Sequence, residues 1–434
     1  MTASKQAKFS GKPVYIIDGA RTPFIKAKGK PGPFSSADLG TAACKALLAR
    51  QPFAASEIDE VITGCAVASA SETNISRIIT LRSGCSENTP AWTVQRNCAS
   101  GMQALDDASK DIASGRCHLV LAGGADAMSR GPILYNDAMV LWLARLSRSK
   151  TFADKLKTFL AFRPHLLKPV IGLLCGLTDP ICGLSMGQTA EIVAYDFGIT
   201  REMMDAYALR SHQRLAQAQV EKHLSEIIAI FDTQGKVYQS DDGLRADTTL
   251  AQLAKLKPSY EKPFGTITAG NSSQVTDGAA FVILASEEAL TKYRLTPLAK
   301  IVDINWAALN PAVMGLGPAH AIAPLMARNQ LSLNDIDYFE INEAFAAQVL
   351  GDLAALASNE YCQNHFGLDA IGTIDQAKLN IDGGAIALGH PIGASGARIV
   401  LHLAQTLKRT ATKRGIASLC IGGGQGGAML IESV

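Results

Sequence analysis

The strongest constraint on the fold is an internal repeat, because the same order of elements occurs twice along the 434 residues. In each half an apolar strand pattern precedes a helix, a second strand, a turn of small residues that opens a helix, and a strand ending in glycines. The paired segments are VYIIDG at 14–19 with AKIVDI at 299–304, IDEVIT at 58–63 with IDYFEI at 336–341, and NCASGMQAL at 97–105 with GHPIGASGARIV at 389–400. Because strands alternate with helices, we predict two duplicated α/β domains, each with helices covering a mostly parallel sheet.

Residues between the two copies do not fit the repeat and indicate an inserted domain. Helical periodicity over 186–197 and 201–221 predicts two amphipathic helices there. Large insertions on a rigid scaffold often carry substrate binding, so we expect this one to lie over the site. The predicted division is an N-terminal domain of 1–127 plus 274–294, an inserted domain of 128–273 and a C-terminal domain of 295–434.

The first part of the insertion, residues 128–183, contains a basic and apolar stretch from Leu141 to Gly183. Its run PVIGLLCGL at 169–177 is too short and too interrupted by glycine to span a bilayer. Contact with a membrane surface or a partner subunit is one interpretation. We favour the alternative, a locally packed loop.

Composition sets the broad class. Hydrophobic residues make up 47% of the chain, and a net charge of +2 gives no reason to expect nucleic acid. The nine cysteines show no metal-binding spacing, so we expect reduced thiols, no metal and a cytoplasmic protein. The first 13 residues lack an apolar core and arginines, and we expect no targeting signal there.

Cys98 is the candidate nucleophile of the first half. The turn NCASGM places it at the start of a helix, whose positive end favours thiolate over thiol. A buried, inert cysteine is the alternative interpretation.

The second half supplies the matching candidates. His390 lies in a turn of small residues that lets a ligand approach, and Cys420 closes a strand just before Gly422 to Gly424. Backbone N–H groups of such a loop can hold an oxyanion, although a phosphate-binding or packing loop is an alternative. Asn342 follows the IDYFEI strand, where helix capping is the simpler role. Two thiols and a histidine suit acyl transfer combined with proton transfer at carbon.

These segments together resemble the signature blocks of thiolases, the acetyl-CoA acyltransferases. The blocks are NCASGMQAL from residue 97, INEAFA from 341, GGAIALGHPIGASGARI from 383 and CIGGGQGGAM from 420. The resemblance also includes GARTPF, GGADAMS and TAGNSSQVTDGAA, and so extends over nearly the whole chain. It implies the thiolase fold, a five-layered α-β-α-β-α core with an inserted loop domain.

The resemblance also implies roles. Cys98 matches the nucleophile that becomes acylated, and His390 matches the base that activates it and later the CoA thiol. Cys420 matches the acid/base acting on the acetyl-CoA methyl carbon. Asn342 matches the residue holding a water that forms one oxyanion hole with His390. The backbone N–H groups of Cys98 and Gly422 match the second hole.

Coenzyme A is then a substrate, and no cofactor is expected. Homodimers or homotetramers are implied by the resemblance alone. The expected CoA and substrate contacts are Arg245, Ser273, Ala269, Gly270, Met186 and Phe345.

Departures from the pattern bear on the substrate. Many short-chain biosynthetic thiolases have histidine where this chain has Ser185. The insertion and the phrases at 207–219 and 253–266 resemble thiolase subunits of fatty-acid β-oxidation complexes, which work with a hydratase/dehydrogenase subunit. Those subunits typically carry histidine where this chain has Asn342. We therefore predict a degradative thiolase with a medium or broad acyl range. The alternative is a short-chain acetyl-CoA acetyltransferase.

Two rival classes share the scaffold. A ketoacyl synthase normally pairs its cysteine with two histidines, and Cys420 argues against it. A non-catalytic acyl-CoA binder would be expected to lack at least one of Cys98, His390 and Cys420, yet all three are present.

Overall fold

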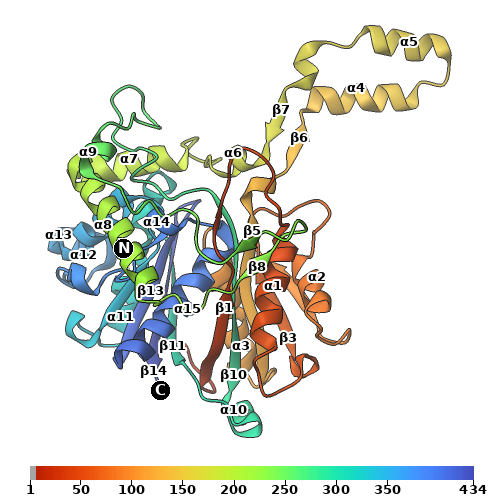
Figure 1. Ribbon diagram of the computed structural model, residues 1–434. Coiled ribbons are helices and arrows are strands. Elements are labelled where there is room, and N and C mark those ends of the chain that lie inside the picture. Colours follow the sequence, from red (N-terminus) through yellow and green to blue (C-terminus); the bar gives the residue numbers. More distant parts are fainter. Residues whose placement is uncertain (1–5) are drawn as a thin grey trace.

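The computed structural model describes residues 6–434, and Figure 1 shows a layered body from which a thin arm projects. The expectation about a targeting signal rests partly on residues 1–5, which lie outside the described residues. Within residues 6–434 no helix combines the length and the apolar character that crossing a bilayer requires.

The first half is interrupted by the insertion, so its last strand and last helix follow the insertion in the chain. Its elements are β1 (Val14–Arg21), β2 (Ile25–Lys26), α1 (Ser36–Leu48), β3 (Glu60–Gly64), α2 (Ile75–Arg82), β4 (Ala91–Val94), α3 (Ser100–Ala113), β5 (Leu119–Ala127), β10 (Thr276–Ser286) and α10 (Glu287–Tyr293).

The second half repeats this order, as the sequence predicts. Its elements are β11 (Ala299–Ala308), α11 (Gly317–Arg328), β12 (Tyr338–Ile341), α12 (Ala346–Ala357), α13 (Asn359–Phe366), α14 (Ala385–Leu388), α15 (Ile392–Thr410), β13 (Arg414–Ile421) and β14 (Gln425–Ser433).

The sheets of the two halves join into one, in the order β12-β13-β14-β11-β1-β10-β5-β3-β4. The join is short, because β1 pairs with β11 only from Val14 to Ile16. The prediction of a mostly parallel sheet is wrong: the β3/β4, β3/β5 and β12/β13 pairs are parallel, and the others are antiparallel. In the second half the reason is local, since the tight turn between β13 and β14 can join only antiparallel strands.

Five layers result, which confirms the predicted core. Helices α3 and α15 form the central layer and pack on each other, with sheet on both sides (Figure 1). Helices α1 and α2 cover the outer face of the first half, and α11 covers that of the second, with α12 packed against α11. The central position explains why nearly every residue of α15 is buried. The three-part domain division stays a prediction.

The insertion has two parts that differ in packing. Helices α7 (Met186–Asp196) and α8 (Arg201–Val220) pack against the second half, close to the ranges that periodicity predicts. The shorter elements of this part are β8 (Ile230–Phe231), β9 (Val237–Tyr238) and α9 (Leu250–Ala254).

The other part is the arm, residues 133–171, which projects from the body (Figure 1). Strands β6 (Ile133–Tyr135) and β7 (Pro169–Ile171) form its antiparallel stalk, and α4 (Asp137–Arg148) and α5 (Phe152–Leu160) form its tip. The preferred interpretation of a locally packed loop is wrong here. The tip helices pack on each other, with Trp142 against Phe162, and leave Phe152 82% exposed. The short helix α6 (Gly172–Gly176) follows at the arm's base.

Candidate active site

Cys98 and His390 occupy matching positions at the starts of the two central helices. Cys98 precedes Ala99, the N-cap of α3, and His390 precedes Pro391, the N-cap of α15. Neither cap residue bonds the helix with its side chain, so the first N–H groups of both helices remain free of a local cap. The duplicated fold thus aims both turns at the same region.

One cavity of about 110 Å³ brings the three reactive candidates together. Cys98, His390 and Cys420 all line it. Cys98 is far from the other two in the sequence, and the packing of α3 on α15 brings them together. Three of the expected substrate contacts, Met186, Ser273 and Phe345, line the same cavity.

The Cys98 thiol differs from the sequence prediction. Burial raises its pKa, although hydrogen bonds from the backbone N–H groups of Gly422 and of Cys98 itself act in the opposite direction. The expectation that the helix start favours thiolate is therefore wrong for the resting protein. Removing water from the sulfur outweighs the nearby N–H dipoles, so a base must take the proton during the reaction. The two N–H groups are those predicted for the second oxyanion hole.

His390 is held as a neutral imidazole with a defined tautomer. Burial, and then the charge of Arg398, lower its pKa to about 4. Its Nδ1 lies 2.6 Å from Ser395 Oγ, and that hydroxyl donates to the Pro391 carbonyl at 2.9 Å. Because the Ser395 proton is already used, Nδ1 carries the proton and Ser395 accepts it. The lone pair of Nε2, which is buried without a partner, is then the free base.

Cys420 is suited to the opposite task. It closes β13 and is 1% exposed, and burial raises its pKa well above the usual value, with the nearby Cys98 contributing. A thiol that stays protonated can donate a proton to a carbanion formed beside it.

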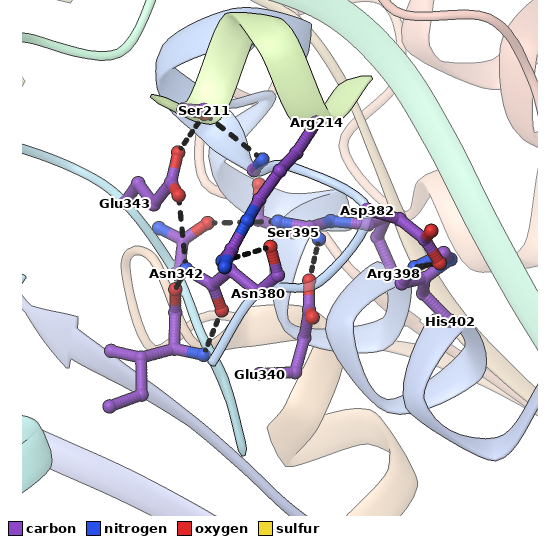
Figure 2. A network of polar contacts seen from close by, with 12 residues as sticks. Ser211, Arg214, Glu340, Asn342, Glu343, Asn380, Asp382, Ser395, Arg398 and His402 are labelled. Atoms are coloured by element: carbon purple, nitrogen blue, oxygen red, sulfur yellow. Dashed lines mark hydrogen bonds and ion pairs between the residues drawn. The ribbon is translucent and has the colours of Figure 1, made fainter. Parts of the chain in front are cut away.

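Asn342 lies at the end of β12 in a dense polar network, shown in Figure 2. Its Oδ1 accepts a long hydrogen bond of 3.4 Å from Arg398 Nη2, and Arg398 Nη1 in turn bonds Glu340 at 2.5 Å. This contact turns the amide so that Nδ2, which is buried without a partner, is its free donor. The capping interpretation is wrong, because Phe345 is the N-cap residue of α12.

The network also ties the insertion to the site. Glu343, next to Asn342, accepts hydrogen bonds from Tyr207 at 3.0 Å and Ser211 at 2.6 Å, both on α8. Asn380 donates to the same carboxylate at 3.0 Å (Figure 2). These contacts fix α8 relative to the turn that carries Asn342.

The remaining expected contacts lie away from the reactive cavity. Arg245 and Ala269 are exposed, and Gly270 is buried against Leu253 and Leu256. None of the three lines the cavity around Cys98. Their roles toward CoA stay predictions.

Sequence reasoning missed Ser395 and Arg398, which set the tautomer and the charge state of His390. The signal was available in part, because Ser395 lies five residues after His390 within one turn of small residues. No comparable signal existed for Arg398, because its partners Glu340 and Asn342 lie in β12 and directly after it, far from Arg398 in the sequence.

The fold and the cavity define a cysteine-dependent acyltransferase built on two duplicated α/β halves. Two family models match the chain, Thiolase, N-terminal domain, over residues 14–288, and Thiolase, C-terminal domain, over 295–433. The chain belongs to the thiolase family, and it is an acyltransferase of that family.

Similar proteins include enzymes of two kinds. The mitochondrial trifunctional enzyme subunit beta of Bos taurus is 36% identical over 437 residues, covering 99% of this chain and 91% of the relative. A beta-ketoadipyl-CoA thiolase of Pseudomonas knackmussii is 39% identical over 427 residues, covering 97% and 99%. The crystal structure of human mitochondrial 3-ketoacyl-CoA thiolase in complex with CoA matches with a TM-score of 0.84 and 35% identity, covering 99% of this chain and 100% of that one.

Proposed function

We propose that this chain cleaves 3-ketoacyl-CoA with CoA into acetyl-CoA and a shortened acyl-CoA, as part of fatty-acid degradation. The observation that carries the proposal is the single cavity in which a cysteine, a neutral histidine with a free Nε2 and a protonated second cysteine meet. Run backwards, the reaction condenses acetyl-CoA with an acyl-CoA, and with two acetyl-CoA molecules it makes acetoacetyl-CoA, which is the short-chain alternative.

In the acylation step His390 Nε2 takes the Cys98 proton, and the sulfur attacks the C3 carbonyl. The C2–C3 bond breaks, its electrons form the acetyl-CoA enolate, and Cys420 gives C2 a proton. The acyl group now sits on Cys98, and a proton passes from His390 to Cys420. Donors must face the oxyanion as it forms, and the hydrogen bonds from the N–H groups of Gly422 and Cys98 to the Cys98 sulfur support this role for them.

In the transfer step His390 takes the proton of the incoming CoA thiol, whose sulfur attacks the acyl carbonyl. Cys98 leaves as a thiolate and recovers a proton from His390. The neutral resting state of His390 suits both steps, because a base must be unprotonated to begin each one.

Cleavage of a matched set of 3-ketoacyl-CoAs from acetoacetyl to long chain tests the proposal, with Cys98→Ala as control. Activity that rises with chain length supports the degradative role. Activity confined to acetoacetyl-CoA supports the acetyltransferase alternative. No cleavage, or a fully active Cys98→Ala variant, would contradict the proposal.

We propose that the arm contacts a membrane surface rather than a hydratase/dehydrogenase subunit. Large apolar side chains at its tip are exposed, among them Phe152 at 82%, Phe159 at 65% and Leu160 at 68%. Lys150, Lys155 and Lys157 lie among them. Apolar and basic side chains on one exposed element suit an anionic lipid surface.

Sedimentation with phosphatidylcholine vesicles, with and without phosphatidylglycerol, tests this contact. The wild-type chain should bind the anionic vesicles, and Phe152→Asp/Phe159→Asp should not. Val220→Asp, at an exposed residue outside the arm, is the matched control. No binding by the wild type would favour a protein partner instead.

A further inference from the structure

A second cavity opens on the other side of Cys98. It measures about 190 Å³ and shares Cys98, Leu177, Met186 and Ile392 with the first cavity. His390 and Cys420 do not line it. The CoA thiol must approach through the first cavity, where both proton-transfer groups lie. The acyl tail on Cys98 therefore points toward the second.

The walls of this second cavity are apolar. Val67, Pro132, Leu173 and Leu177 contribute hydrocarbon surface. Its side-chain amides belong to Gln95 and Asn97, and each already donates a hydrogen bond. Gln95 Nε2 bonds Asn97 Oδ1 at 3.3 Å, and Asn97 Nδ2 bonds the Gly422 carbonyl at 2.8 Å. Among residues 6–434, the side chains lining this cavity include no lysine, arginine or histidine.

A buried carboxylate lies behind one wall. Asp126 accepts hydrogen bonds from the N–H groups of Ala66 at 3.1 Å, Val67 at 2.8 Å and Gly393 at 2.5 Å, and from the Cys65 thiol at 3.2 Å. Burial raises the pKa of Asp126, but all four partners act as donors, and these hydrogen bonds favour the ionised carboxylate. Its negative charge opposes a second carboxylate entering the cavity.

We infer that the second cavity binds the acyl tail, accepts uncharged apolar tails and excludes tails that end in a carboxylate. A terminal carboxylate would lose part of its water against these apolar walls and find no cation to pair with. The inference rests on the proposed function and specifies its substrate class. It separates this chain from the beta-ketoadipyl-CoA thiolases to which it is 39% identical.

The cavity also limits how much of the tail is enclosed. Its volume slightly exceeds that of an engineered apolar cavity of about 150 Å³ that holds benzene. A tail of about six carbons is therefore the enclosed part. Gly176 lies at the exposed rim, where an added Cβ would meet nothing within 4 Å.

The test compares two substrates with the same six-carbon backbone, 3-ketohexanoyl-CoA and 3-ketoadipyl-CoA, by their kcat/KM values. We expect the uncharged substrate to be favoured by roughly 10- to 100-fold, because the carboxylate loses water against apolar walls and gains no cation in return. Equal values would overturn the inference while leaving the proposed function intact. Cleavage of neither substrate, nor of acetoacetyl-CoA, would be a failure of the proposed function itself.

Two variants of α6 test the cavity directly. Leu173→Arg places a cation in the cavity and should reduce the preference at least about 10-fold, because the carboxylate then gains a partner. Leu174→Arg is the matched control, since Leu174 is 58% exposed on the same helix and does not line the cavity. An unchanged ratio in Leu173→Arg, or an equal change in Leu174→Arg, would overturn the inference.

Folding of the variants is checked with acetoacetyl-CoA, whose tail is a single methyl group and does not fill the cavity. If Leu173→Arg fails this check, Gly176→Arg at the open rim takes its place. It should also reduce the preference, and an unchanged ratio would again overturn the inference.

Discussion

Cys98 and His390 stand at the same point of the duplicated unit, yet we propose one as the nucleophile and the other as the base. Each lies one residue ahead of the N-cap of a central helix. Their surroundings differ, because Cys98 faces the N–H group of Gly422, whereas His390 bonds Ser395 and lies near Arg398. Duplication supplies two equivalent positions, and contacts from other elements decide what each one does.

Each half also supplies a side chain that hydrogen-bonds the backbone of a turn in the other half. Asn97 of the first half bonds the Gly422 carbonyl of the second at 2.8 Å. Asp126 of the first half bonds the Gly393 N–H in the first turn of α15 at 2.5 Å. Neither turn is therefore positioned by its own half alone.

Replacing Cys98 or His390 with alanine should have the largest effect on activity. Cys98→Ala should lose the acyl-enzyme entirely and lower kcat on the order of 10⁴-fold or more. His390→Ala should lower kcat by roughly 10²–10⁴-fold, since a general base contributes about that much. Mass spectrometry of the chain after incubation with substrate measures acylation. Acyl label on Cys98→Ala would contradict the assignment.

Breaking the contact between the halves should reduce stability. Asp126→Asn replaces an acceptor of four hydrogen bonds with an amide that must turn N–H groups toward other N–H groups. We expect the free energy of unfolding to fall by about 2–3 kcal/mol, measured in urea. Asp196→Asn, at an exposed position ending α7, should change it little. Equal effects of the two substitutions would show that Asp126 is not a link between the halves.

Freeing the His390 ring should lower activity less than removing it. Ser395→Ala takes away the acceptor that fixes the Nδ1 proton, so we expect kcat to fall about 10-fold with little change in KM. Ser109→Ala is the control, because Ser109 is a buried serine of the matching helix α3 that bonds only the Leu105 carbonyl, at 2.6 Å. A fall in kcat in both variants would point to packing rather than to the tautomer.

Two buried histidines should give opposite pH effects on stability. His402, between Glu226 and Asp382, has its pKa raised to about 10, whereas the pKa of His390 is lowered to about 4. The contribution of His402 is complete below its ordinary value of 6.5 and is lost as pH rises toward 10. That of His390 is complete above 6.5 and is lost as pH falls toward 4.

Melting temperatures across this pH range measure both contributions. His402→Gln should remove the alkaline decline specific to His402, and the exposed His165→Gln should not. An unchanged alkaline limb in His402→Gln would contradict a cationic His402. For activity, kcat/KM should stay level down to about pH 5 and fall near pH 4, where His390 gains a proton.

The sequence predicted the reactive residues because their local patterns are distinctive. Cys98 and His390 lie in turns of small residues that open helices, and Cys420 lies before three glycines. The two duplicated α/β halves followed from the repeat, and the five-layered core followed from the resemblance to thiolases. The direction of the strands did not, because residue patterns indicate strands without showing how they pair.

The errors share a physical cause. The thiolate prediction for Cys98 weighed the helix start but not the loss of water around the sulfur. The arm was expected to pack locally, yet its apolar residues find no partner on the body. Ser395 and Arg398 were missed because their effect on His390 exists only once the chain has folded.

The order of elements, the candidate reactive groups and membership in the family could be inferred from the sequence itself, since each depends on motifs of residues close together in the chain. Protonation states, the free tautomer of His390 and the apolar second cavity were decided only by the tertiary structure. Those properties depend on burial and on contacts such as Asn97 with Gly422, between residues 325 positions apart. No local pattern encodes the water that folding removes from such groups.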